Sequence, residues 1–214
     1  PFEYEIKDLS KNASLQAFLD LLSLNENRFD PTSIFKLFSN PYFALFTDIE
    51  VKELKKFFVD SGVKWGVDSA HRKKLLPGYT DSTKNGTWEE AFKHLLTNLI
   101  FLPENLSSWD LPYLDTTDSI LLGKCISTVR SLKKDLDQLF SKELPGFTWA
   151  DLLLELLSRY FTLDEQSLSP LHDKILSLKE LDATYSFSSI KRLHYIISKI
   201  DYLLINSFGC HSND

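Results

Sequence analysis

Apolar residues recur at alternating steps of three and four through most of this chain, and this spacing restricts the possible folds more than any other feature. The step is that of one face of an α-helix. It is sustained longest over residues 119–140 and 188–206. Glycine is scarce, with 7 residues in 214, and leucine is abundant, which favours helices over a turn-rich β-sandwich. We predict an all-α fold, a bundle-like domain of several helices.

The two longest helical stretches carry narrow apolar seams of about three heptads or fewer. Such seams fit helices that pack side by side within one bundle, and this interpretation is favoured over a coiled coil formed with a partner. The first seam comprises Leu122, Cys125, Val129, Leu132, Leu136 and Leu139, and the second comprises Ile190, Leu193, Ile197, Ile200 and Leu204.

Capping residues predict where other helices begin. A side-chain oxygen just before a helix accepts from its free N–H groups, and proline fits the first helical position. Expected caps are Asn12, Asp30 (before Pro31), Asp48 and Thr148. The apolar segment 42–46 is expected to be a buried turn of helix.

The chain divides into an entry segment, one helical domain and a tail. In residues 1–8, apolar and polar side chains alternate with the period of a short strand, which we expect to join a sheet of an adjacent domain. The helical domain is predicted at 9–206 and the tail at 207–214. Because the chain begins at Pro1 and not at methionine, we expect it to be a fragment of a longer protein.

The stretch 61–90 departs from the helical pattern. It holds two tryptophans, five glycines or prolines and three consecutive basic residues, and it is predicted to form an irregular loop at 61–87. One interpretation is a nucleic-acid surface, in which cations neutralise phosphates and an aromatic ring stacks on a base. The candidate binding residues are Lys64, Arg72, Lys73 and Lys74, with Trp65 as the aromatic ring.

The other interpretation of this stretch is structural. Trp65 and Trp88 would pin the loop to the helices, since tryptophan buries a large apolar area and its N–H can bind a loop carbonyl. Asp68 would cap a short helix, and Thr87 would form a capping box with Glu90. We favour the structural role for the two tryptophans, and both roles stay open for the three consecutive basic residues.

Charge and cysteine content limit the class of protein. The formal net charge is −6, which argues against a nucleic-acid binder that uses its whole surface, although Lys and Arg outnumber Asp and Glu by seven to four over residues 50–75. Two distant cysteines form neither a disulfide framework nor a zinc pattern, and they fit a reducing compartment. With no apolar run of about 20 residues, we expect a cytoplasmic protein without a membrane partner.

The sequence lacks the motifs of common catalytic sites. It has no GxxxxGKS/T loop for nucleotide phosphates, no HExxH zinc motif and no GxSxG nucleophile motif. The five histidines have no Asp, Glu or Cys neighbours at ligand spacing. We therefore expect no catalytic residue, no cofactor and no metal ligand in this chain.

Residues 1–88 resemble a segment of the RecC family, the gamma subunits of bacterial exodeoxyribonuclease V. Three pieces match in order. PFEYEIKD and then LQAFLDLLSLNENRF are similar to a family run that ends in LLSLPxSRF, and SGVKWGVDSAHR is similar to the family's SGIRWGxD turn. GTWEEAFKHLL is similar to TWxFGLxRLLLG, with Glu90 and Ala91 where the family has Gly and Leu.

This resemblance implies a function. RecC-like proteins resemble superfamily 1 helicases without the ATPase motifs, and the matched segment corresponds to the helical insertion of their second motor-like domain. It implies a non-catalytic scaffold and DNA-channel element, with DNA and the other exodeoxyribonuclease V subunits as partners. The complex unwinds and degrades double-stranded DNA ends for recombinational repair and recognises Chi, with its motors and nuclease in the other two subunits. The alternatives are a helical protein–protein adaptor that does not contact DNA and an enzyme with an unrecognised site.

Overall fold

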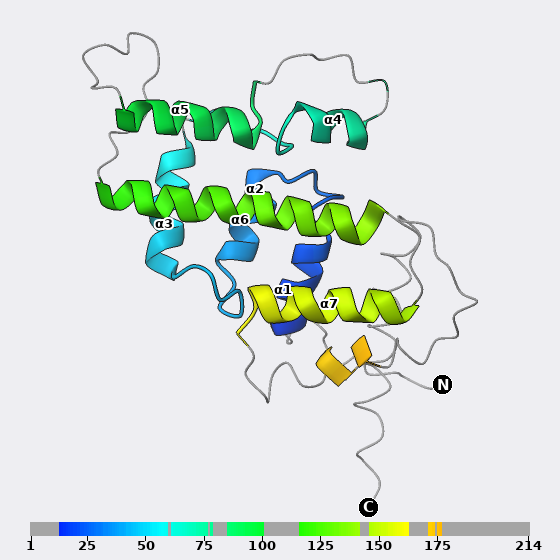
Figure 1. Cartoon of the computed structure of the whole chain (residues 1–214). Helices are drawn as coiled ribbons and strands as arrows, with labels where there is room; N and C mark the ends of the chain where they lie inside the picture. Colours follow the sequence, from blue (N-terminus) through cyan, green and yellow to red (C-terminus); the bar gives the residue numbers. More distant parts are fainter. Residues whose placement is uncertain are drawn as a thin grey trace, which may run out of the picture. The chain divides into compact units, whose positions relative to one another are not determined.

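The computed structural model describes residues 13–59, 61–76, 78, 85–100, 116–141, 146–162, 171–173 and 175–176. These residues form helices α1 to α7 (Figure 1) and contain no sheet, only an isolated bridge between Phe43 and Phe161. The predicted all-α class is confirmed. The predicted strand-like segment 1–8, the predicted cap Asn12, the predicted helix 188–206 and the tail 207–214 lie outside the described residues, so the predicted division of the chain stays a prediction.

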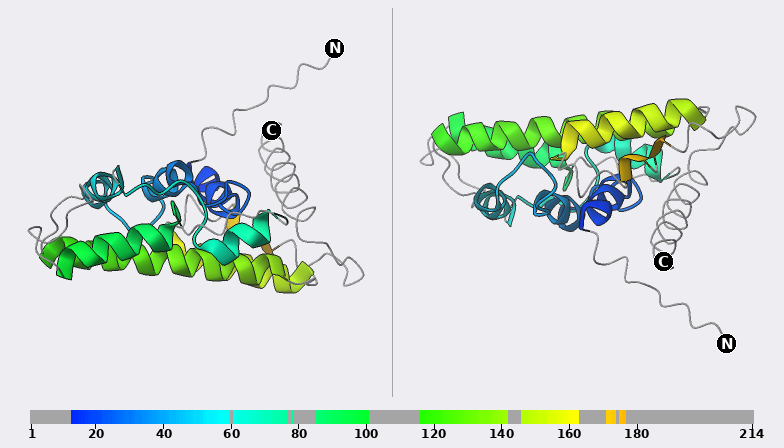
Figure 2. Two further views of the ribbon diagram at one scale, coloured as in Figure 1. Left: turned by 90° about the horizontal axis from the view of Figure 1, so that it is seen from above. Right: turned by 90° about the horizontal axis from the view of Figure 1, so that it is seen from below.

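The helices belong to two compact units. Unit 1 contains α1 (Ala13–Leu22), residues 42–45, the end of α6 from Asp135 onward and α7 (Gly146–Tyr160). Unit 2 contains α2 (Pro31–Phe38), α3 (Asp48–Val59), α4 (Ser69–Leu75), α5 (Trp88–Ile100) and α6 (Thr116–Ser141) as far as Lys134. Figure 2 shows two layers within unit 2: α2 and α3 lie in one, and α4, α5 and the first part of α6 lie in the other.

Aromatic side chains form the core of unit 2. The Trp88 ring centroid lies 5.0 Å from that of Phe58 on α3 and 6.1 Å from that of Phe35 on α2. Each such ring removes a large apolar area from water, at about 25 cal/mol per Å². The faces of α2 and α3 that the sequence predicts are confirmed as buried: Ile34, Phe35, Leu37, Phe38, Val51, Leu54, Phe57 and Phe58.

Ion pairs connect the helices of unit 2 at its surface. Lys124 Nζ on α6 lies 2.6 Å from Glu50 Oε1 on α3, and Arg130 of α6 donates from Nε and from Nη2 to the two oxygens of Glu89 on α5, each at 2.6 Å. Partial burial acts to raise the pKa of Glu50, but the bonds from Lys124 and from Thr47 outweigh it, and the net pKa is lowered. Hydrogen bonding to Glu89 raises the pKa of Arg130. Both pairs therefore favour the charged forms.

The segment 42–45 in unit 1 is not the helical turn that its composition predicts. The Ala44 N–H donates to Tyr160 O (2.9 Å), and the Thr162 N–H donates to Tyr42 O (3.0 Å). Phe43 is buried and stacks on Tyr160 at 5.9 Å, whereas Ala44 is exposed. Pairing with the chain that leaves α7 satisfies the backbone here, so no local helix is needed.

Two predicted helix starts are corrected and one is confirmed. Asp30 caps α2 by accepting the Ser33 N–H (3.0 Å), as expected. The start of α3 is capped by Thr47 and not by Asp48, because Thr47 and Glu50 form a capping box: the Thr47 N–H donates to Glu50 Oε2 (2.7 Å), and Glu50 N–H donates to Thr47 Oγ1 (3.3 Å). Helix α7 already begins at Gly146, so Thr148 lies in its first turn.

The prediction of a buried apolar face is confirmed for α6 but for only part of α5. All six seam residues of α6 are buried, from Leu122 to Leu139. On α5, only the first part of the predicted face is buried, because the aromatic cluster covers its N-terminal half: Trp88, Ala91, Phe92 and Leu95 are covered, whereas Ile100 is 76% exposed. The buried seam confirms the intramolecular interpretation for residues 119–140.

Candidate nucleic-acid interface

Three segments that are distant in sequence meet in unit 2 and hold one another through main-chain hydrogen bonds. We call this set the loop node, and it comprises residues 28–29, 64–68, 72 and 85–89. The Gly66 N–H donates to Arg28 O (2.7 Å), and Gly66 O accepts from the Trp88 N–H (3.1 Å). The Glu89 N–H donates to Val67 O (2.9 Å). The same three segments carry the family resemblance, so the motifs correspond to one structural feature.

Trp88 is the apolar centre of the loop node. Its side chain is 0% exposed, and its Nε1–H donates to Phe29 O (2.7 Å). Trp88 is buried and its N–H binds a main-chain carbonyl, as predicted, but that carbonyl belongs to the turn before α2 and not to the loop 61–87. Thr87, just before α5, accepts the Glu90 N–H at its Oγ1 (3.3 Å), the N-terminal half of the expected capping box.

The turn before α2 adopts a backbone conformation that non-glycine residues rarely take. Arg28 and Phe29 have φ angles of 57° and 53°. The left-handed region costs about 1 kcal/mol or more for each such residue. Bonds from the other two segments offset this cost, since Gly66 N–H binds Arg28 O and the Trp88 indole binds Phe29 O. The turn also places the exposed Arg28 guanidinium carbon 5.7 Å from the centroid of the Trp65 ring.

The buried side chain of Arg72 holds two segments of the loop node together. Its side chain is 3% exposed, and it donates to three main-chain oxygens. Nε and Nη2 donate to Trp65 O at 3.1 and 2.9 Å, Nη1 donates to Asn85 O at 3.0 Å, and Nη2 also donates to Gly86 O at 2.8 Å. Its guanidinium carbon lies 4.6 Å from the Trp65 ring centroid. The sequence left both a DNA-binding and a structural role open for Arg72; its guanidinium is buried and holds the loop, which favours the structural role.

Gly66 is required by this packing. It has φ of +76°, and a Cβ there would lie 2.8 Å from Arg72 Cγ. Only a residue without a side chain allows the loop to run this close to the buried arginine. The glycine of the sequence motif is therefore explained by the neighbouring helix.

Helix α4 carries both buried and exposed residues of the site. Asp68 caps it by accepting the His71 N–H (2.7 Å), as expected. The His71 ring is buried, and its Nδ1 accepts the Val67 N–H (3.2 Å), which assigns the neutral form with the proton on Nε2. Lys73 on the other face is exposed. Helix α4 therefore exposes a lysine to solvent on one face and holds the loop with buried residues on the other.

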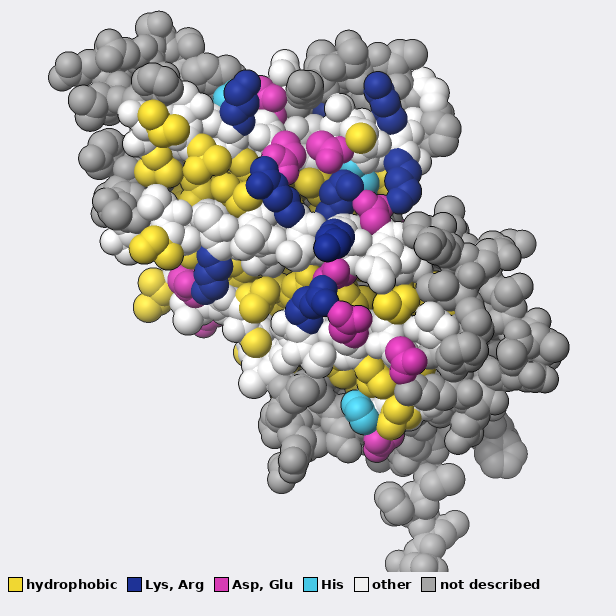
Figure 3. Space-filling model, in the orientation of Figure 1, with side chains coloured by type: hydrophobic (Ala, Val, Ile, Leu, Met, Phe, Trp, Pro, Cys, Tyr) yellow, Lys and Arg dark blue, Asp and Glu magenta, His cyan; other side chains and the backbone are white. Residues whose placement is uncertain are grey.

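The exposed cations of the site come from three segments. Figure 3 shows Lys and Arg side chains gathered over α4. The predicted Lys64, Lys73 and Lys74 are exposed, and Trp65 is partly exposed beside them. The sequence missed Arg28, which lies more than thirty residues away. Its signal was the Asn-Arg-Phe end of the first family motif, where the arginine precedes a buried phenylalanine.

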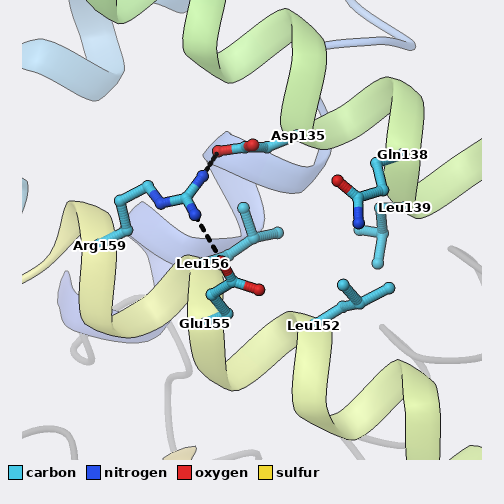
Figure 4. A pocket seen from close by; sticks show the side chains of 7 residues that line it. All are labelled: Asp135, Gln138, Leu139, Leu152, Glu155, Leu156 and Arg159. Carbon is cyan, nitrogen blue, oxygen red and sulfur yellow. Dashed lines mark hydrogen bonds and ion pairs between the residues drawn. The ribbon is translucent and has the colours of Figure 1, made fainter.

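Unit 1 contains a shallow hollow between α6 and α7 (Figure 4). Its polar lining residues are already paired: Arg159 bonds to Asp135 Oδ2 (2.5 Å) and to Glu155 Oε1 (2.5 Å). Tyr160 donates its hydroxyl to the same Asp135 oxygen (2.7 Å), and burial, followed by this bond, raises the pKa of Tyr160. These groups connect the two helices and do not form a ligand site.

The described residues contain no group of three or more His, Cys, Asp or Glu side chains that could hold a metal ion. Cys125 is buried on α6, and burial raises the pKa of its thiol, which makes it a poor nucleophile. Among the described helices, none is both long enough and apolar enough to cross a membrane.

The fold and the site define a helical domain with an aromatic loop. Buried side chains hold this loop in place, and lysines are exposed on its surface. Comparison with known proteins identifies the family. Residues 11–196 match the family described as "RecBCD enzyme subunit RecC fourth domain", and the chain belongs to this family. It is 25% identical over 195 residues to the RecBCD enzyme subunit RecC of Buchnera aphidicola subsp. Acyrthosiphon pisum, covering 86% of this chain and 18% of that protein.

A second relative is the RecBCD enzyme subunit RecC of Escherichia coli strain K12, with 26% identity over 176 residues, which cover 77% of this chain and 15% of that protein. The chain thus spans less than a fifth of the length of these curated relatives. The resemblance inferred from the three motifs is confirmed, and it extends well beyond residue 88.

Proposed function

We propose that this chain is a non-catalytic scaffold and DNA-channel domain of a RecC-type subunit of exodeoxyribonuclease V. The observation that carries the proposal is the family match over residues 11–196, with the motif segments joined in one loop node. In this role the domain acts with the other subunits in unwinding and degrading double-stranded DNA ends for recombinational repair, in the complex that recognises Chi. Catalysis is assigned to the other subunits.

The DNA contact is assigned to the exposed lysines of the loop node and α4, namely Lys64, Lys73 and Lys74. Lysine neutralises phosphates and releases counterions, so such contacts weaken as salt rises. Arg72 supports this surface by holding the segment that bears Lys64, because it bonds to Trp65 O in that segment and to Gly86 O in the segment beside it. It is a positioning residue in this account.

The test is salt-dependent binding of a fluorescein-labelled oligonucleotide to the chain, followed by anisotropy from 50 to 200 mM salt. Each phosphate contact to a single strand contributes about 0.7 to the slope of log K against log salt. Changing both Lys73→Gln and Lys74→Gln is expected to reduce this slope by about 1.4. The matched control is Lys52→Gln with Lys55→Gln, two exposed lysines of α3 whose loss changes the net charge equally. An equal reduction in both pairs, or no binding at 50 mM salt, would contradict the DNA contact.

The alternative is a helical adaptor that does not contact DNA. It relied on the apolar seams as docking surfaces, and the seam on α6 is buried within the folded chain. This function would be favoured if the chain bound the other subunits and showed no DNA binding at 50 mM salt.

A further inference from the structure

Asn85 and Gly86 form the only Asn-Gly pair in the chain. In such a pair the glycine N–H, which no neighbouring Cβ shields, can attack the side-chain carbonyl carbon of the asparagine. Asn85 is exposed, and both residues lie in the turn just before α5. The loop node therefore carries, at its surface, a pair of residues with the local chemistry for deamidation.

The fold requires glycine at position 86. Its φ is +76°, and a Cβ there would lie 3.1 Å from Gly62 O and 3.5 Å from Arg72 Nη2. A residue with a side chain would be strained in this conformation and would crowd the buried guanidinium. The packing of the loop node therefore keeps an unshielded N–H next to Asn85.

Hydrogen bonds hold the peptide group that joins these two residues. Arg72 donates from Nη1 to Asn85 O (3.0 Å) and from Nη2 to Gly86 O (2.8 Å). Gly86 O also accepts the N–H groups of Lys64 (2.9 Å) and Trp65 (3.3 Å). Attack on the side chain requires this peptide group to rotate, which breaks hydrogen bonds to a buried cation. The charge of Arg72 would also stabilise a deprotonated nitrogen, but the ring cannot close while the peptide group is held.

We infer that Asn85 is a site of spontaneous deamidation, and that the hydrogen bonds of Arg72 set its rate. The Gly86 nitrogen loses its proton and bonds to Asn85 Cγ, and the side-chain amide leaves as ammonia, which gives a cyclic imide. Water then opens the imide at one of its two carbonyls, and the product is aspartate or isoaspartate. The reaction needs only water, and the inference is independent of the proposed function because no step involves DNA.

Either product changes the loop node. Each adds a carboxylate beside a surface on which residues 61–76 contain four Lys or Arg and one acidic residue. Isoaspartate also lengthens the main chain by one carbon, which displaces Gly86 O from its donors on Lys64 and Trp65. Because ammonia is lost, the modified fraction increases with the age of the protein.

The experiment incubates the 214-residue chain at mildly alkaline pH, folded or in denaturing guanidinium chloride. Mass spectrometry follows the peptide that contains Asn85, and enzymatic methylation detects isoaspartate. The folded chain should be modified at least about tenfold more slowly than the unfolded chain, because the reaction must wait for the loop node to open. Asn27, which is also exposed but precedes Arg28, should stay unmodified in the folded chain over the same time.

Arg72→Lys tests the role of the hydrogen bonds. It removes the planar set of donors and should accelerate modification of the folded chain at least about fivefold. Arg159→Lys, the same exchange in unit 1, should leave the rate unchanged. If circular dichroism shows that Arg72→Lys does not fold, guanidinium chloride concentrations too low to unfold the wild-type helices replace it, and these should also raise the rate.

The possible failures are distinct. No modification of Asn85 in the unfolded chain would overturn the site itself. Equal rates in the folded and unfolded chains would overturn protection by the loop node. A rate in the folded chain that neither Arg72→Lys nor low guanidinium chloride changes, or one that Arg159→Lys raises equally, would overturn control by Arg72.

Discussion

Replacement of Trp88 by alanine tests the packing of the loop node most severely. The side chain is 0% exposed and contacts the rings of Phe35, Phe58 and Phe92, at centroid distances of 6.1, 5.0 and 5.7 Å. Truncating a buried aromatic side chain costs about 3–5 kcal/mol. The change also leaves Phe29 O without its indole donor, which adds about 1 kcal/mol or more.

Urea denaturation followed by circular dichroism at 222 nm measures this loss without depending on tryptophan emission. With an m-value of about 2.5 kcal/mol/M, a loss of 4 kcal/mol lowers the midpoint by about 1.6 M. Trp88→Phe is the control, because it keeps an aromatic ring and removes the hydrogen bond; it should cost roughly 1–3 kcal/mol. If Trp88→Ala changed the free energy of unfolding by less than about 0.5 kcal/mol, the residue would not pin the loop and the account of the node would be wrong.

Three further predictions concern the same unit. Gly66→Ala should cost about 2–4 kcal/mol because its Cβ meets Arg72, whereas Gly62→Ala, with a similar φ of +71° but nothing within 4 Å, should cost only about 1 kcal/mol; similar losses in thermal unfolding would refute the steric argument. Arg72→Lys should cost about 2–3 kcal/mol, since an ammonium group cannot bond to three carbonyls in a plane, and faster hydrogen exchange at the Gly66 amide would report the loosened loop. Glu50→Gln should destabilise the protein at pH 7. Because the folded pKa of Glu50 is lowered, its contribution exists above the unfolded value of 4.5 and is lost as pH falls through the folded pKa, so urea midpoints of the two proteins should converge in acid; a constant gap would exclude the ion pair with Lys124 as its cause.

Helix periodicity predicted much of the fold because it reports which side chains one helix buries. The seam of α6 and the faces of α2 and α3 followed from spacing alone. Spacing did not predict segment 42–45, because its backbone is satisfied by pairing with residues after α7. It also could not show that the last turns of α5 extend past the aromatic cluster that covers its first half, which leaves Ile100 exposed.

The candidate site was only partly predictable for a related reason. Local rules identified Asp68 as a cap and Trp88 as an anchor, since those roles depend on neighbours in sequence or on side-chain size. Three consecutive basic residues look alike in sequence, but the turn of α4 directs Arg72 inward and Lys73 outward. The position of Arg28 beside Trp65 depends on a left-handed turn and on long-range hydrogen bonds, which no local pattern encodes.

Photo-crosslinking in the assembled complex tests the central claim, DNA contact by the surface of α4, most directly. A p-benzoylphenylalanine is placed at Lys73 or, as the control, at Lys52 of α3, in the full-length subunit bound to its partners and to a labelled forked DNA. The account predicts crosslinks from position 73 at several times the yield from position 52. Equal yields at the two positions, or no crosslink at position 73 in a complex that still unwinds DNA, would contradict it.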